Sequence, residues 1–208
     1  MSAVCRSPKA SRGLAVVLAA ALSWVSVQAQ PVGAQSVAPQ SANAQPATVA
    51  AKVPEVHGTS FADQPINLPH DLQGKVGVLV LGFTQGSRDA VTAWGKRLTA
   101  DYFSSQSVQY YEMPVLASVP RFMRGFVTGK IKGAVSDRAK PRFVPITENE
   151  TGWRTLTHYD RGDDAYLVLV DGTGAVLWQT HGAFEEASYT AMKAHLEEFR
   201  SAIAHSGQ

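Results

Sequence analysis

Two runs of consecutive apolar residues stand out in the pattern of hydrophobic and polar positions along the chain. "VGVLVLGF" spans residues 76–83, and the second run lies between the two aspartates of "DAYLVLVD", residues 164–171. Strands without alternating polar positions are typical of a sheet that is covered on both faces. We therefore predict that these runs form central, neighbouring strands of one sheet, which also contains parallel pairing.

Three other segments, residues 87–103, 119–135 and 183–203, have apolar positions at helical spacing. The apolar stripe of the first consists of Ala90, Val91, Trp94, Leu98 and Tyr102, and Met192, Leu196 and Phe199 can face the core from the last. Ser87 or Asp89 can cap the first helix. Three glycines weaken the helical preference of the second segment.

Two more strands complete the predicted sheet. Residues 108–116 are rich in β-branched and aromatic side chains, and residues 175–182 follow the turn "DGTG", which indicates a hairpin. Residues 142–159 are expected to hold a short strand and one helical turn. The resulting order β-α-β-α-β-β-α predicts an α/β fold with a central mixed sheet flanked by helices on both faces.

The N-terminal region has the layout of an export signal. Basic residues precede the apolar stretch 13–25, and Ala29 ends a fair cleavage site. We predict a signal peptide over 1–29, a disordered low-complexity linker over 30–55 and one folded domain over 56–208. The protein is then exported, to the periplasm in a bacterium. The alternative is an uncleaved N-terminal segment that anchors it to the membrane.

Charge and cysteine content exclude two classes of function. Of the 19 Lys and Arg, three lie in the predicted signal, against none of the 17 Asp and Glu, so the remainder has a net charge close to −1. General attraction to nucleic acid is therefore not expected. The only cysteine, Cys5, also lies in the signal. Cysteine-based redox chemistry is accordingly not expected of the mature chain.

The element order, with the lead-in "INLPHDLQGKVGVLVLGF", resembles the thioredoxin-like superfamily and its peroxiredoxin and TlpA-like branches. Within it, "AYLVLVDGTGAVLWQTHGAFEEA" is similar to a block of the ATP synthase assembly factors of mitochondria (the Atp-ten type) and their bacterial relatives. The matching positions in this block are Tyr166, Asp171, Gly174, Trp178, Gly182, Glu185 and Glu186. Upstream, "GFTQGSRDAVTAW" is similar to the family's strand-loop-helix that ends in Trp, here Trp94. The resemblance implies an assembly or interaction role that does not depend on a dithiol.

The chain departs from these families at two positions. Asp164-Ala165 stands where thioredoxins have a cis-proline, which further disfavours thiol–disulfide exchange. Leu177 stands where the assembly factors have a basic residue, so their function does not transfer directly.

A polar loop stands where the dithiol of such a fold would lie. Its candidate residues are Thr84, Gln85, Ser87, Arg88 and Asp89. A loop between a strand and a helix N-terminus offers free N–H groups, which suit an anion or a carboxylate. The alternatives are a cysteine-independent enzyme that uses this pocket, and a solvated loop in which Ser87 and Asp89 only cap the helix.

Seven positive side chains lie between residues 121 and 142. On a helical wheel, Arg121, Arg124 and Lys132 fall within a sector of about 80°. This basic sector predicts docking to an acidic protein partner, within a membrane complex, or peripheral contact with an anionic membrane. The alternative is an ordinary solvated helix face.

The histidines lack metal-ligand spacing and no catalytic constellation is evident, so we predict no metal, cofactor or catalytic residue.

Overall fold

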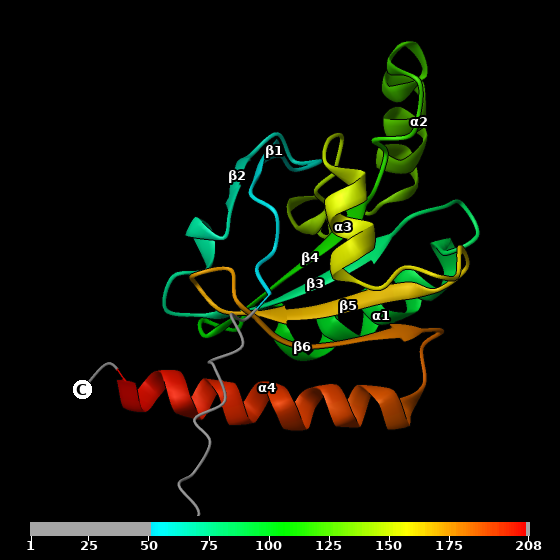
Figure 1. The fold of residues 1–208 in the computed structure, drawn as a ribbon. Helices are drawn as coiled ribbons and strands as arrows, with labels where there is room; N and C mark the ends of the chain where they lie inside the picture. The colour runs from blue at the N-terminus through cyan, green and yellow to red at the C-terminus, as the bar shows by residue number, and fades with distance from the viewer. Residues whose placement is uncertain (1–50, 207–208) are drawn as a thin grey trace, which may run out of the picture. The chain divides into compact units, whose positions relative to one another are not determined.

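A mixed four-stranded sheet forms the centre of the protein. The computed structural model describes residues 51–206. The strands are β3 (Val76–Gly82), β4 (Val108–Pro114), β5 (Ala165–Val170) and β6 (Val176–Gly182). Their order is β4-β3-β5-β6, with β3 parallel to β4 and antiparallel to β5, as Figure 1 shows. Every residue of β3 and β5 is buried, which confirms the prediction of two central neighbouring strands.

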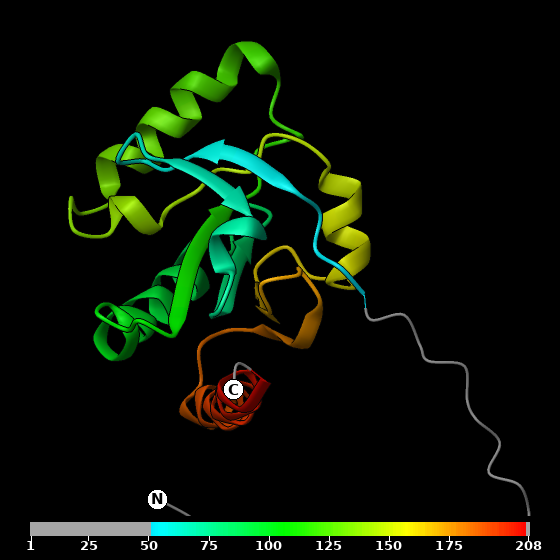
Figure 2. The same ribbon diagram turned by 90° about the vertical axis from the view of Figure 1, so that its left-hand side faces the viewer.

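Helices cover both faces of this sheet, as predicted. On one face lie α1 (Arg88–Tyr102) and α4 (Glu186–Ser206). The opposite face carries α3 (Glu150–Leu156) and a small antiparallel sheet of β1 (Val56–Thr59) and β2 (Pro65–Leu68), as the turned view in Figure 2 shows. The predicted inward residues Trp94, Leu98 and Met192 are all buried.

The small sheet was not expected from the sequence. Each of its strands has four residues, and β2 starts at Pro65, so turn residues dominate this part of the chain. Short 3₁₀ helices, η1 (His70–Leu72) and η2 (Lys140–Arg142), accompany it. Residues 142–159 contribute two isolated parallel bridges to the β4 side, through Phe143 and Ile146, before α3 begins.

The folded unit begins before residue 56. Lys52 forms an antiparallel bridge with Ala175, and Val53 is buried in the core and donates its N–H to the carbonyl of Gly174. The last residues assigned to the linker are therefore ordered against the β5–β6 hairpin. The predicted signal peptide, Cys5 and linker residues 30–50 lie outside the described residues.

One helix, α2 (Arg121–Ala134), projects from the rest of the domain (Figure 1). It is predicted correctly as a helix, yet it contains no buried residue. Within residues 51–206, no helix combines the length and the apolar character needed to cross a membrane.

Candidate functional site

Strand register brings three chain segments to one end of the sheet. Leu81 near the end of β3 pairs with Tyr166 near the start of β5, and Tyr166 pairs in turn with His181 near the end of β6. The loop that links β3 to α1 therefore lies beside the segment that precedes β5. This is where the sequence places the candidate pocket.

The hydroxyl groups of the β3–α1 loop are engaged within the protein. Thr84 Oγ1 donates to the carbonyl of Gly162 at 2.7 Å and accepts from the N–H of Gly86 at 3.0 Å. Ser87 Oγ donates to the carbonyl of Thr84 at 2.9 Å, and Ser87 is only 1% exposed. The protons of both hydroxyl groups are thus engaged within the protein.

The prediction that the Ser87 side chain caps α1 with a hydrogen bond is wrong. Ser87 does occupy the N-cap position, but its side chain makes no capping hydrogen bond, because its hydroxyl points back to Thr84. Asp89 lies within the first turn of the helix, where its charge suits the positive end of the helix dipole. Gln85, Arg88 and Asp89 are exposed.

Acidic side chains face this loop. A Cβ on Gly86 would collide with the carboxylate of Asp163, so that carboxylate lies directly against the loop backbone. Asp160 and Asp164 belong to the same short segment. The carboxylate of Asp163 beside the loop disfavours an anion at this position, so we do not base a proposal on anion binding here.

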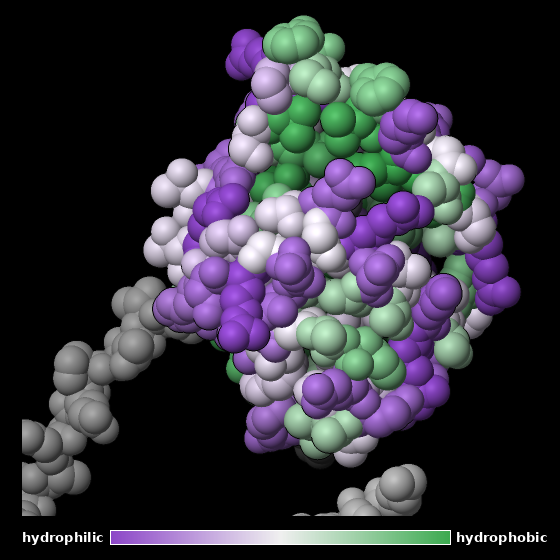
Figure 3. Space-filling view, turned by 90° about the vertical axis from the view of Figure 1, so that its right-hand side faces the viewer, coloured by the Kyte–Doolittle hydropathy of each residue, from purple (hydrophilic) through white to green (hydrophobic). Residues whose placement is uncertain are grey.

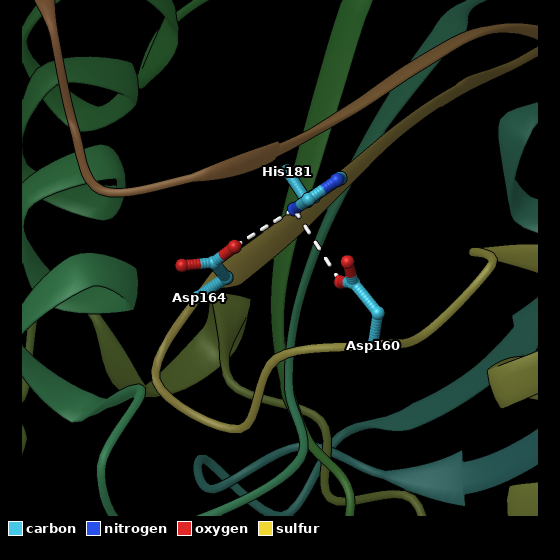
Figure 4. A group of neighbouring side chains, drawn as sticks. All are labelled: Asp160, Asp164 and His181. Atoms are coloured by element: carbon cyan, nitrogen blue, oxygen red, sulfur yellow. Dashed lines mark hydrogen bonds and ion pairs between the residues drawn. The ribbon is translucent and has the colours of Figure 1, made fainter.

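Two of these aspartates surround His181 (Figure 4). The Nδ1 atom of His181 lies 2.7 Å from Asp164 Oδ2 and 3.9 Å from Asp160 Oδ1. One ligand atom from each of the three residues lies within 4.8 Å of the other two. The trio could approach one cation, but the hydrogen bond to Asp164 already uses Nδ1. The arrangement is that of an imidazole held in orientation by carboxylates.

Tyr166 anchors the segment that carries these aspartates. Its hydroxyl accepts from the N–H groups of Asp160 and Arg161 at 3.0 and 2.9 Å, and it contacts Asp160 Oδ1 and the Arg161 carbonyl at 3.0 Å each. Burial raises the pKa of the Tyr166 phenol above its usual value, so the hydroxyl stays protonated. Its ring stacks on His181 at 5.1 Å.

The sequence could not bring His181 and the aspartates together, since they belong to no recognisable spacing motif. The one available signal was the predicted hairpin. Pairing Ala165 with Gly182 places the residue before β5 close to the residue before Gly182. To pair His181 with Asp164 from this signal, the register of the two strands in the hairpin would have to be known.

The residues that carry the resemblance to the assembly factors are spread over α1, the β5–β6 hairpin and the start of α4. Trp94 is buried between α1 and α4, and Asp171 Oδ1 accepts hydrogen bonds from the N–H groups of Thr173 and Ala175 in the hairpin turn. Gly174 and Gly182 have φ angles of +82° and +139°, in the region that favours glycine. Trp178 stacks on His195, while Glu185 and Glu186 stand at the start of α4.

The structure separates the three residues of the predicted basic sector. Arg121 is exposed, but Arg124 donates to the carbonyls of Val119 and Ala117, and Lys132 pairs with Asp63 at 3.1 Å. The side of α2 that points outward is instead the aromatic side. Phe122 is 87% exposed, Phe126 65% and Met123 41%.

No family model and no curated protein sequence matches the chain. Among solved structures, it is similar to a protein assigned as the thiol:disulfide interchange protein DsbE of Chlorobium tepidum, at 18% identity and a TM-score of 0.51 over 72% of this chain and 95% of that one. It is also similar to the exposed lipoprotein thioredoxin of Streptococcus pneumoniae strain TIGR4, at 10% identity and a TM-score of 0.52 over 70% of this chain and 99% of that one. The fold is therefore thioredoxin-like.

Proposed function

We propose that this thioredoxin-like chain is an exported, redox-inactive interaction protein that docks a protein partner through α2, as an assembly factor for a membrane complex would. The observation that carries the proposal is the outward apolar face of α2, which consists of Phe122, Met123 and Phe126. They are the exposed large hydrophobic side chains among the described residues. Figure 3 shows apolar side chains gathered at the end of the molecule from which α2 projects.

Exposed aromatic side chains are costly, because each leaves a large apolar area in water. Contiguous apolar patches on a soluble protein mark sites of interaction. A Cβ at Gly125, Gly129 or Gly133 would meet no atom within 4 Å, so the helix backbone is open to close approach. Arg121 and Lys130 are also exposed on α2 and supply positive charge beside the apolar face. An apolar partner surface with acidic residues at its border fits this face.

Export and redox inactivity have support from other features. The N-terminal 29 residues have the layout of a secretory signal. One similar structure is named an exposed lipoprotein thioredoxin, and the other a thiol:disulfide interchange protein. In this chain the loop in the corresponding place, Thr84-Gln85-Gly86-Ser87, has no cysteine. The fold is then used for binding in place of thiol exchange.

Purified residues 30–208 are expected to show no reduction of insulin disulfides and no turnover of hydrogen peroxide, because both reactions need a thiolate. Insulin turbidity in the presence of dithiothreitol measures the first activity, with a dithiol thioredoxin as the positive control. Turnover above the rate with dithiothreitol alone, from protein free of contaminating thioredoxin, would contradict redox inactivity.

A photo-cross-linker placed at residue 126 is expected to capture one defined protein in the native cell envelope. The matched control places the same group at Ala194, which is exposed on α4, at the far side of the sheet from α2. Phe122→Ser combined with Phe126→Ser should reduce partner binding by at least about tenfold, since truncating exposed aromatic anchors often costs more than about 1 kcal/mol. The free energy of unfolding should change by less than about 0.5 kcal/mol.

Equal cross-linking from residues 126 and 194, or unchanged binding of the captured protein by the double variant, would refute docking through α2. Binding to vesicles of anionic lipid that the double variant loses would assign this face to a membrane surface instead. Arg121→Glu alone should mainly slow association, because charges at the rim act on the encounter rate.

A further inference from the structure

A cleft of about 370 Å³ opens beside β4, the strand at the edge of the sheet. Its wall is formed by α1 on one side and by residues 134–143 on the other. The polar lining residues are Glu112 from β4, Thr92, Lys96 and Thr99 from α1, and Ser136 and Arg138 from the segment after α2. The volume is at the lower end of the range of small-molecule sites.

Glu112 is a buried carboxyl group without a partner. It is 4% exposed, and its side chain makes no hydrogen bond or ion pair within residues 51–206. Its carboxyl group lies against Gly95, where any Cβ would overlap it, so the glycine makes room for the carboxyl. Burial raises the pKa of Glu112 to about 8. At neutral pH the group is therefore mainly uncharged and offers both a donor and an acceptor.

Buried polar groups in folded proteins nearly always have hydrogen-bond partners, and leaving one without a partner is unfavourable. The hydroxyl of Thr99, which also lines the cleft, does not pair with Glu112: it donates to the Gly95 carbonyl at 2.7 Å and bonds to the Tyr110 hydroxyl at 2.9 Å. A carboxyl that lines a cleft and has no protein partner is suited to a group supplied by a ligand.

Two cations stand at the exposed part of the same cleft. Lys96 has no carboxylate partner in the described part of the chain, and Arg138 stacks on the ring of Phe103 at 4.1 Å. The neighbouring acid, Asp137, is paired with Lys140 at 2.6 Å and does not neutralise them. The cleft therefore combines two unpaired positive charges with one buried hydrogen-bonding group.

We propose that this cleft binds a small organic anion, whose carboxylate or phosphate lies between Lys96 and Arg138 and whose hydroxyl or carbonyl group hydrogen-bonds to Glu112. A volume of about 370 Å³ corresponds to roughly a dozen water molecules, which limits the ligand to a similar number of non-hydrogen atoms. The site is separate from the β3–α1 loop and does not depend on docking through α2.

The test titrates glycerophosphate, and lactate as the carboxylate counterpart, into the full chain at about pH 6, followed by amide NMR shifts and calorimetry. Saturable shifts are expected at residues 92–99 and 134–143. Lys96→Gln with Arg138→Gln should weaken binding at least about tenfold, which corresponds to about 1.4 kcal/mol. Both side chains are exposed, so the variant should keep the wild-type melting temperature.

Arg88→Gln is the matched control, because it removes an exposed cation from the β3–α1 loop and should leave binding unchanged. Above about pH 8, where Glu112 ionises, wild-type affinity should fall more than that of Glu112→Gln. The charged and titratable groups around Glu112 are Lys96 on α1, Arg138 after α2 and Tyr110 on β4.

Three results would overturn the proposal. The first is no saturation by either probe at about 10 mM, tenfold above a millimolar Kd. The second is binding that the double variant retains, and the third is binding that Arg88→Gln abolishes. Preference for one probe over the other would identify the anionic group without changing the assignment of the cleft.

Discussion

Replacing Glu112 with glutamine is expected to flatten the pH dependence of stability between about pH 5 and pH 8. In the folded protein, burial raises the pKa of this carboxyl from 4.5 to about 8. Between these values the unfolded chain loses the proton while the folded protein keeps it, so unfolding becomes more favourable as the pH rises. The wild-type protein is thus expected to be most stable, with respect to this group, below about pH 4.5.

The size of the effect is large, because each unit of difference in pKa corresponds to about 1.4 kcal/mol. The wild-type protein should lose several kcal/mol of this contribution by about pH 8 and little more above it. Glutamine fills the same space without ionising. Glu112→Gln should therefore match the wild type near pH 5 and exceed its free energy of unfolding near pH 8.

Urea denaturation at several pH values measures this difference. The matched control is Glu148→Gln, which removes an exposed carboxyl outside the cleft and should keep the wild-type pH dependence. If Glu112→Gln and the wild type lose stability in parallel between about pH 5 and pH 8, Glu112 does not have the buried, unpaired environment described here.

The second large effect is expected for Trp94→Ala, which should lower the free energy of unfolding by about 3–5 kcal/mol. Trp94 is 1% exposed, and its ring lies 5.3 Å from that of Phe184 and 6.0 Å from that of Tyr189. It fills the space between α1 and the start of α4. Alanine would leave a cavity that the sheet behind it cannot close.

Trp178→Ala is the comparison, because this tryptophan is only half-buried on β6 and stacks mainly on His195. Its removal should cost about 1 kcal/mol. Chemical denaturation of both variants gives the two free energies. Similar losses of unfolding free energy for the two variants would mean that Trp94 does not pack α1 against the start of α4 as the structure indicates.

The central part of the fold could be predicted from sequence alone. The continuous apolar runs of β3 and β5 can be buried only inside a sheet that is covered on both faces. The helical stripe with Trp94 and Leu98 likewise determines which face of α1 packs inward. The β3–α1 loop contains no cysteine, so the sequence alone excludes a dithiol there.

The orientation of α2 needed the tertiary structure. A helical wheel separates Phe122 and Phe126 from Arg124, but it does not say which side meets the domain. Because Arg124 finds the carbonyls of Val119 and Ala117, and Lys132 finds Asp63, the aromatic side is left outward. Two of these partners lie close to Arg124 in sequence, but Asp63 lies 69 residues from Lys132, so the side of α2 that faces the domain depends on the tertiary structure.

Long-range contacts also created the polar sites. Glu112 is the one acid of strand β4, and it becomes a buried, unpaired carboxyl because Gly95 of α1 packs over it. His181 meets Asp164 through the register of the β5–β6 hairpin. The sequence by itself determined the four strands of the central sheet, the three longer helices and the missing thiol, since these follow from local pattern and composition. The environment of each ionisable group depends on residues distant in the chain, and only the tertiary structure decided it.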